Sequence, residues 1–250
     1  MNAGKSPSVS IIVPAFNEEG IISTCIEELF KVMRAANYCT EVVVVNDGST
    51  DQTLMKAKFN LKTYPYLRVL SFRRHHGKAT ALREGIRAAR GDIVALFDAD
   101  LQYDPSDLVM LLDVLNKGPD IVTGKRDFLR YQRTRAVFST IYNRLLRLIF
   151  RLDVSDSNCG MKVLRRKTSN MDFLFRFGTA LMMPLLKLRG YRIAEREVSL
   201  RQRKVGQSKF FDDRSFLGGW KHIKAVSYHS GMLLCLLASL PSEWSRSRVH

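Results

Sequence analysis

The sequence predicts an α/β fold in which a mostly parallel β-sheet is flanked by helices. Short apolar segments alternate along the chain with longer segments whose apolar residues recur at helical spacing. The apolar segments are continuously hydrophobic, which is typical of strands covered by helices on both faces. A chain of 250 residues is long enough to form one large domain with a buried core.

The first two strands and the helix between them have the clearest patterns. Ser8–Pro14 is rich in β-branched residues, and Glu41–Thr50 contains a run of valines before a turn. Between them, Glu18–Ala36 carries one apolar helical face formed by Ile22, Ile26, Leu29, Val32 and Met33. We therefore expect a strand, a helix and a second strand.

The same alternation continues through the next hundred residues. Leu67–Phe72 and Asp92–Asp98 are short apolar segments typical of strands, and Ala79–Ala89 between them has helical spacing. A helix is expected over Ser106–Leu115, followed by a strand over Asp120–Gly124. Strands that alternate with helices in this way predict parallel pairing.

Polar side chains follow three of the expected strands. Asn17 and Glu18 follow the first, Asp47 the second, and Asp98 and Asp100 the fourth. Ligands of parallel sheets bind beyond the carboxyl ends of the strands. We therefore expect these side chains to meet at one edge of the sheet.

The stretch ALFDADLQYDP, from Ala95 to Pro105, ends an apolar strand with alternating carboxylates. This pattern indicates a bound cation, although Asp104 and Pro105 could equally begin the helix that follows, with the other two aspartates as loop residues. The spacing alone leaves both alternatives open. The chain has neither a GxGxxG fingerprint nor a Walker lysine loop, so a nucleotide would be held by carboxylates and a metal.

Positive charge is concentrated in the second half of the chain. The net charge is +16, yet residues 1–124 contain 14 Lys and Arg against 15 Asp and Glu. Residues 125–204 contain 20 basic and 6 acidic residues. The second half should therefore face an anionic partner.

The cysteines and the terminal segments indicate a reducing, cytosolic environment. Cys25, Cys39, Cys159 and Cys235 form no CxxC pair, so free thiols are expected and a zinc site is not. The N-terminus lacks the apolar core of a signal peptide. The longest C-terminal apolar run, 231–240, is about half the length needed to cross a bilayer.

Seven motifs together resemble family 2 glycosyltransferases of the GT-A fold, whose sheet is Rossmann-like. Those of the first half are VPAFNEE, VVNDGSTDQT and DADLQYDP. Those of the second half are GKR (Gly124–Arg126), RAVFSTIYNRL (Arg135–Leu145), SDSNCGMKVLRR (Ser155–Arg166) and RKVGQSKF (Arg203–Phe210). The latter are similar to the polyprenyl-phosphate branch, which includes dolichol-phosphate mannosyltransferase and undecaprenyl-phosphate sugar transferases. The resemblance covers residues 8–219.

The resemblance implies a nucleotide-sugar donor, such as GDP-mannose or a UDP-sugar, and a Mg²⁺ or Mn²⁺ ion. Asp47 would accept hydrogen bonds from the base, although it could instead be an Asx-turn residue. Asp98, Asp100 and Gln102 would hold the metal at the diphosphate, because oxygen ligands suit both ions. Lys78 would lie near the diphosphate or remain solvated. The full implied nucleotide set is Pro14, Ala15, Phe16, Glu18, Val45, Asp47, Lys78, Asp98, Ala99 and Asp100.

The implied acceptor is a polyprenyl phosphate, which agrees with the basic second half. Forked guanidinium groups suit phosphate oxygens. The acceptor-phosphate residues implied by the family are Arg126, Arg135, Ser139, Arg203 and Lys209. A phosphate monoester loses its second proton near a pKa of about 6, so it needs no strong general base. The implied reaction is an inverting, direct displacement, with Asp98, Asp100 and Arg126 as the catalytic residues.

The segment 128–152 predicts an amphipathic helix in a 1–212 catalytic domain. Its apolar stripe would comprise Val137 or Phe138, Ile141, Leu145, Leu148 and Leu152, with Arg144, Arg147 and Arg151 along another side. Such a helix is typical of an anionic membrane surface. Packing against the core with a solvated arginine face is the alternative. With a membrane-associating segment at 213–250, we expect association with the cytosolic face of a membrane. The family also leaves a homo-oligomer open.

Two other functions remain as alternatives. The same fold could transfer sugar to a polysaccharide or protein, although the clustered arginines argue against this. A nucleic-acid-binding protein is supported by charge alone, because the basic residues alternate with aliphatic rather than stacking aromatic residues. We expect no nucleic-acid partner.

Overall fold

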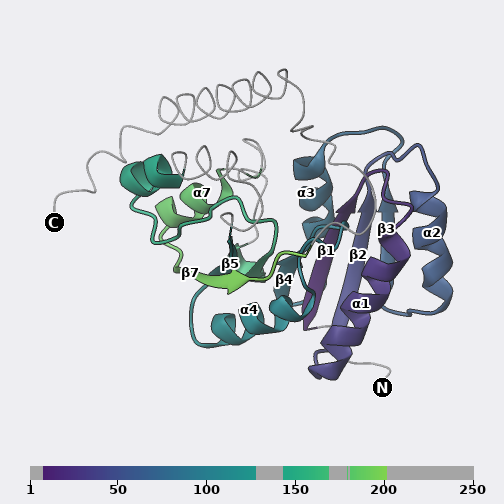
Figure 1. The fold of residues 1–250 in the computed structure, drawn as a ribbon, viewed down its shortest axis with the longest axis horizontal. Coiled ribbons are helices and arrows are strands. Elements are labelled where there is room, and N and C mark those ends of the chain that lie inside the picture. Colours follow the sequence, from purple (N-terminus) through teal and green to yellow (C-terminus); the bar gives the residue numbers. More distant parts are fainter. Residues whose placement is uncertain (1–7, 128–142, 169–178, 180, 202–250) are drawn as a thin grey trace. The chain divides into compact units, whose positions relative to one another are not determined.

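The computed structural model describes residues 8–127, 143–168, 179 and 181–201 (Figure 1). The chain divides into two units, Met1–Gly206 and Gln207–His250, and all described residues belong to the first. The expected boundary at residue 212 lies outside the described residues and stays a prediction.

The described part is built on a seven-stranded sheet of order β3-β2-β1-β4-β6-β5-β7. The strands are β1 Val9–Ala15, β2 Thr40–Asn46, β3 Leu67–Ser71, β4 Ile93–Leu96, β5 Ile121–Arg126, β6 Lys162–Arg165 and β7 Ile193–Val198. The pairs β1–β2, β2–β3, β1–β4 and β5–β7 are parallel. The mostly parallel α/β fold is thus confirmed, and five of its strands fall on the expected segments.

Strand β6 is the exception to parallel pairing. It lies between β4 and β5 and runs antiparallel to both. Because one antiparallel strand separates them, β4 and β5 point in the same direction. Their carboxyl ends, and the first residue of β6, therefore share one edge of the sheet.

Helices cover both faces of this sheet. Those of the described residues are α1 Ile22–Ala35, α2 Thr53–Phe59, α3 Lys78–Ala88, α4 Ser106–Asn116 and α7 Met182–Leu188, with 3₁₀ turns η1 Asn60–Lys62 and η3 Arg166–Thr168. A further helical segment occupies residues 143–150. Helix α1 contacts α2 and α4, whereas α3 packs against β1 and β2.

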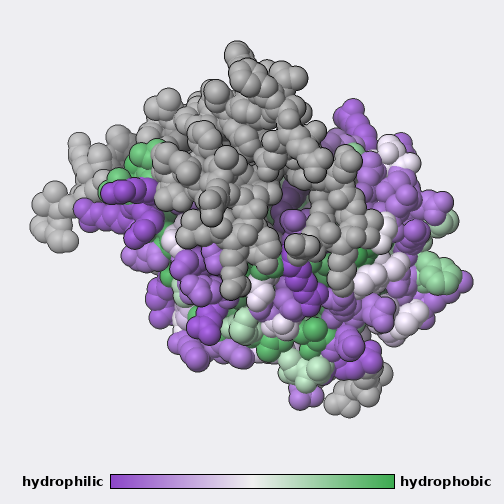
Figure 2. All heavy atoms as spheres, in the orientation of Figure 1, coloured by the Kyte–Doolittle hydropathy of each residue, from purple (hydrophilic) through white to green (hydrophobic). Residues whose placement is uncertain are grey.

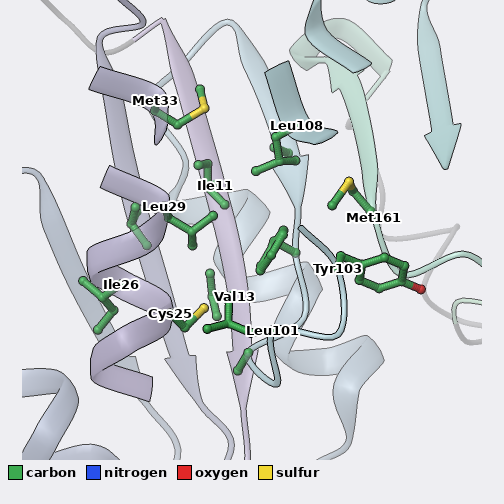
Figure 3. Packing of buried hydrophobic residues seen from close by; sticks show 14 of the residues in the cluster. Ile11, Val13, Cys25, Ile26, Leu29, Met33, Leu101, Tyr103, Leu108 and Met161 are labelled. Atoms are coloured by element: carbon green, nitrogen blue, oxygen red, sulfur yellow. The ribbon is translucent and has the colours of Figure 1, made fainter. Parts of the chain in front are cut away.

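Alternation along β1 explains how it meets helices on both faces. Ile11 and Val13 belong to the core cluster that includes Leu29 of α1 and Leu108 of α4 (Figure 3). A Cβ placed on Gly85 of α3 would lie 2.3 Å from the Ile12 Cγ2 atom, so α3 packs tightly on the opposite face. Burying each such aliphatic side chain contributes about 1.5–3 kcal/mol, which makes the central strands a stable platform for the edge they support.

The surface of the described residues is mostly hydrophilic on the face seen in Figure 2. Its large exposed apolar side chains are Met55, Phe59, Leu61, Met110, Leu145 and Leu148. Within the ranges that the structure describes, no helix has the length and apolarity needed to cross a bilayer.

Candidate active site at the carboxyl edge of the sheet

The loops after β1 and β2 are bound together at the carboxyl edge. Asn17 has a positive φ of 53° and its N–H donates to the Ser49 hydroxyl over 3.0 Å. The Thr50 N–H donates to the Asn17 side-chain oxygen over 2.8 Å, and the Glu18 N–H donates to the Thr53 hydroxyl over 2.7 Å. These contacts delay the start of α1 to Ile22, four residues after the expected start.

Asp47 anchors a second loop to this edge. Its side chain is buried, and its two carboxylate oxygens accept the N–H groups of His76 and Gly77, each over 2.8 Å. The His75 Nδ1 atom lies 2.8 Å from Asp47 Oδ2. Asp47 therefore binds the 75–77 loop, where an Asx turn would have used its own local backbone.

Gly48 permits the close contact between these two loops. Its φ is +68°, and a Cβ at this position would lie 2.3 Å from the Arg74 carbonyl carbon. A side chain would thus meet both backbone strain and a backbone clash. The NDG sequence is therefore fixed by tertiary packing as well as by the turn.

An aromatic pair lines the mouth of this region. The rings of Phe16 and His75 have centroids 4.1 Å apart and an interplanar angle of 33°. His75 is about half exposed. The two tilted rings thus place partly exposed aromatic surface next to the buried Asp47 carboxylate, and a base could stack on such a surface.

Asp98 follows β4 and already contacts one cation. The Phe97 N–H donates to the Ile12 carbonyl, which places Asp98 beside the end of β1. The Lys78 Nζ atom, at the start of α3, lies 2.5 Å from Asp98 Oδ1. The structure thus brings together Lys78 and Asp98, two residues predicted for the diphosphate region.

The turn after Asp98 separates the capping aspartate from the other two. The Ser106 N–H and hydroxyl donate to Asp104 Oδ1 over 2.9 and 2.7 Å, so Asp104 serves the first turn of α4. Asp100 Oδ1 instead accepts the Gln102 N–H over 3.2 Å. The helix-cap alternative therefore accounts for Asp104 alone.

The donor set of this turn fits a hard divalent cation. Carboxylate and amide oxygens suit Mg²⁺ and Mn²⁺, and the ammonium of Lys78 shows that a positive charge is accommodated beside Asp98. Within residues 8–127, 143–168 and 181–201, no three His, Cys, Asp or Glu side chains form a metal-binding group. The protein would thus supply few ligands itself and leave others to a bound diphosphate, as is usual for Mg²⁺.

Arg126 lies at the end of β5, on the same edge as Asp98. Its Nε and Nη2 atoms donate to Asp156 over 2.7 and 2.9 Å in a two-pronged ion pair. Although burial favours the neutral form, the hydrogen bonds and charge of Asp156 raise the pKa of Arg126. Strands β4 and β5 are separated only by β6, so about 10 Å separates their ends.

The other predicted acceptor residues cannot be placed. Arg135, Ser139, Arg203 and Lys209 all lie outside the described residues. Sequence reasoning also missed Asp156 and Glu195, because nothing in their spacing connects them to the edge. The position of Asp156 within the motif SDSNCGMKVLRR is the only feature of the sequence that points to a functional role for this residue.

The helical segment 143–150 divides the predicted apolar stripe. Leu146 and Phe150 are buried, whereas Leu145 and Leu148 are 48% and 71% exposed. Arg144 and Arg147 are exposed as well. Leu145 and Leu148 therefore do not pack against the core, as the core-packing alternative would require, and they share the exposed side with the arginines; the placement of the stripe on a membrane stays a prediction.

Comparison with known proteins agrees with these features. Residues 10–171 match the model of the family described as Glycosyl transferase family 2. Dodecaprenyl-phosphate galacturonate synthase of Rhizobium johnstonii is 30% identical over 85% of this chain and 64% of its own length. Dolichol-phosphate mannosyltransferase of Pyrococcus furiosus is 33% identical over 47% of this chain and 33% of its own length.

A third relative covers more of the sequence, and a solved structure shares the fold. Undecaprenyl-phosphate 4-deoxy-4-formamido-L-arabinose transferase of Proteus mirabilis is 25% identical over 93% of this chain and 68% of its own length. Glucosyl-3-phosphoglycerate synthase of Mycobacterium tuberculosis, solved with Mn²⁺, UDP-glucose and phosphoglyceric acid, is 21% identical with a TM-score of 0.63 over 94% of this chain and 82% of that chain.

The match extends over most of this chain but only part of some relatives. The chain spans 64% of the Rhizobium protein and 50% of the glycosyltransferase CsbB of Bacillus subtilis, described as putative. The family model nevertheless covers both the NDG loop and the DAD turn, together with Arg126 and the segment leading to β6. The resemblance seen in the motifs is confirmed, and the chain belongs to glycosyl transferase family 2.

Proposed function

We propose that this chain catalyses the inverting transfer of a hexose from a nucleotide sugar to a polyprenyl phosphate at the cytosolic face of a membrane. The observation that carries the proposal is the shared edge of the sheet. Asp98, with its Lys78 contact, follows β4 by two residues, and Arg126 ends β5 on the same side. A donor diphosphate and an acceptor phosphate could thus be held about 10 Å apart by one rigid sheet.

The donor would bind over β1, β2 and β4. Phe16 and His75 would contact the base beside Asp47, and Lys78 would contact the diphosphate. Asp98, Asp100 and Gln102 would hold the divalent cation. A bound Mg²⁺ or Mn²⁺ would supply charge stabilisation for the leaving nucleoside diphosphate. The M. tuberculosis neighbour, which was solved with Mn²⁺ and UDP-glucose, supports a divalent cation together with a nucleotide-sugar donor.

The acceptor would be a polyprenyl phosphate, as in the names of three relatives, and it would bind on the arginine-rich side. Arg126 is positioned by Asp156, and Arg135, Ser139, Arg203 and Lys209 are assigned to the same phosphate by family resemblance. The phosphate oxygen would attack the anomeric carbon directly, so no protein nucleophile is required. Positioning and charge would account for the catalysis.

Membrane association is supported by the exposed side of segment 143–150. Leu145 and Leu148 lie in water in the absence of a partner surface, next to the exposed Arg144 and Arg147. Leucines flanked by arginines are suited to the boundary of an anionic bilayer. The protein should pellet with vesicles containing anionic phospholipid and remain in solution with neutral vesicles of the same size.

The test of the reaction is transfer from radiolabelled nucleotide sugars to a short polyprenyl phosphate, with and without Mn²⁺. Asp100→Asn should reduce transfer by at least about a hundredfold, because removing one stabilising group at developing charge costs that much. Asp113→Asn, an exposed position on α4, is the matched control and should remain active. Retained activity of Asp100→Asn, or activity in excess chelator, would contradict the assignment.

A further inference from the structure

We propose that the segment Ser155–Gly160, here called the strap, is a positioning element that fixes Asp98, and that Lys162 and Asp156 hold the strap in place. The inference rests on the proposed function, since it assigns Asp98 to the metal and the donor diphosphate. It adds residues that neither the motifs nor the family relation assigns a role.

The strap touches the carboxylate of Asp98 directly. A Cβ placed on Gly160 would lie 2.3 Å from Asp98 Oδ2 and 3.2 Å from the Tyr103 ring. The other carboxylate oxygen, Oδ1, is the one that contacts Lys78. Asp98 is therefore confined between a lysine on one side and the strap backbone on the other.

Tyr103 links the end of the strap to the core. The Gly160 N–H donates to the Tyr103 hydroxyl oxygen over 3.0 Å. The ring of Tyr103 belongs to the core cluster beside Met161, and its oxygen points away from the cluster (Figure 3). The last residue of the strap is thus fixed by a side chain from the turn that follows Asp98.

Lys162 binds the backbone of the strap through a buried ammonium group. The side chain is almost wholly buried, and Nζ donates to the carbonyl oxygen of Cys159. Lys162 is paired in register with Leu96 on β4, two residues before Asp98. Burial lowers the pKa of Lys162 to about 8.

A buried lysine whose hydrogen-bond acceptor is a backbone carbonyl lowers the stability of the fold, so stability does not explain its presence. Desolvating an ammonium group costs several kcal/mol, and a single carbonyl bond does not restore this. Perturbed, buried cations of this kind concentrate at functional sites. The position of Lys162, under the strap and beside the edge that receives the diphosphate, gives the buried charge a role.

The beginning of the strap is tied to the acceptor side. Asp156 accepts the two-pronged bond of Arg126. Glu195 on β7 accepts the Ser155 hydroxyl over 2.6 Å and the Asp156 N–H over 2.7 Å. Asn143 accepts the Ser157 hydroxyl over 2.8 Å. The strap therefore joins the arginine that would bind acceptor to the aspartate that would bind metal.

The first test compares Lys162→Met with Lys167→Met. The first variant keeps most of the side-chain volume and removes the donor to Cys159. The control removes Lys167, an exposed lysine on η3 that pairs with Asp120. It lies just after the last residue of β6, whereas Lys162 is the first residue of that strand. Binding of Mn²⁺ with a nucleoside diphosphate is measured by calorimetry, and thermal unfolding is measured without ligands.

Lys162→Met should weaken Mn²⁺-dependent nucleotide binding by about tenfold, as loss of residues that orient metal ligands typically does. Its melting temperature should stay the same or rise, because a buried charge is removed. Lys167→Met should bind as the wild type does. Unchanged binding in Lys162→Met, whatever its melting temperature, would show that Lys162 has only a structural role.

Gly160→Ala provides a second, independent variant. The new methyl group would displace Asp98 Oδ2, so Mn²⁺-dependent binding should fall at least tenfold while the unliganded fold is retained. If wild type and Gly160→Ala bind equally, the strap inference fails and the proposed function stands. If the wild type binds no nucleoside diphosphate with Mn²⁺, the proposed function fails and the strap inference with it.

Discussion

The two halves of the described chain differ in the charged side chains that they bury. In residues 8–124, all of the buried charged side chains are acidic, namely Glu41, Asp47, Asp107 and Asp120. In residues 125–201, the described part buries Lys162 and Asp156, and Arg126 is largely enclosed beside them. Among the described residues, a fully buried cation therefore occurs only in the second half, where Lys162 begins β6 and Arg126 ends β5 at the same edge of the sheet.

The buried carboxylates of the two halves also have different partners. Asp47 accepts backbone N–H groups of the 75–77 loop. Asp156 accepts a guanidinium group from β5. Backbone donors are uncharged, so a change of the carboxylate costs them only a hydrogen bond, but a largely buried guanidinium that loses this carboxylate loses a charged partner as well. The comparison predicts unequal effects of the same substitution.

The largest effect is expected for Asp156→Asn. Removing the negative charge takes away the carboxylate that holds the largely enclosed Arg126 in a two-pronged ion pair, which should lower the free energy of unfolding by about 3 to 5 kcal/mol. Urea unfolding at pH 7 measures this difference. The surface pair Lys187–Asp153 is the control, and Asp153→Asn should leave stability nearly unchanged, because the Asp153 side chain is exposed to solvent. Equal effects at 153 and 156 would contradict the role of burial.

The next effect is the pH dependence that comes from Lys162. Its pKa is lowered from 10.5 to about 8 by burial, so between these values the unfolded chain binds more protons than the folded one. Stability then rises with pH, by about 3 kcal/mol between pH 7 and pH 10.5. The penalty for the buried charge is thus fully present below pH 8 and is relieved above it.

Denaturant unfolding of wild type and Lys162→Met at both pH values isolates this contribution. The variant lacks the titrating group, so its stability relative to the wild type should be highest at pH 7 and fall by about 3 kcal/mol at pH 10.5. Lys167→Met, which removes an exposed lysine, should show no such trend. A constant difference between wild type and Lys162→Met would mean that the lysine keeps an ordinary pKa.

The donor side could be predicted well because its functional residues follow strands directly. Asp47 and Asp98 lie one or two residues beyond continuous apolar runs, and parallel strands bring their carboxyl ends to one edge. The start of α1 was placed too early at Glu18, since helical spacing does not reveal that Asn17 and Glu18 bind the neighbouring loop. The local hydrophobic pattern therefore predicts which strands and helices form, whereas hydrogen bonds between distant residues determine where they begin and end.

The arginine-rich side was less predictable because its contacts connect distant residues. Strand β6 has only four residues, and its position between β4 and β5 depends on the whole sheet. Glu195 binds Ser155 across forty residues, without any periodicity to indicate it. Likewise, the sequence pattern did not single out Leu146 and Phe150, which are buried, because the buried side of this helical segment depends on the elements packed against it.

The smallest effect is expected for Asp47→Asn on the donor side. Asparagine retains one oxygen for the N–H groups of His76 and Gly77, but its amide nitrogen would face the other donor. An unsatisfied buried N–H lowers stability by about 1 to 2 kcal/mol, less than the loss of a carboxylate that pairs with a largely buried guanidinium. The loosened 75–77 loop should also weaken nucleoside diphosphate binding. Calorimetry and urea unfolding measure both, and a stability loss equal to that of Asp156→Asn would mean that the buried anion, and not its partner, determines the energy.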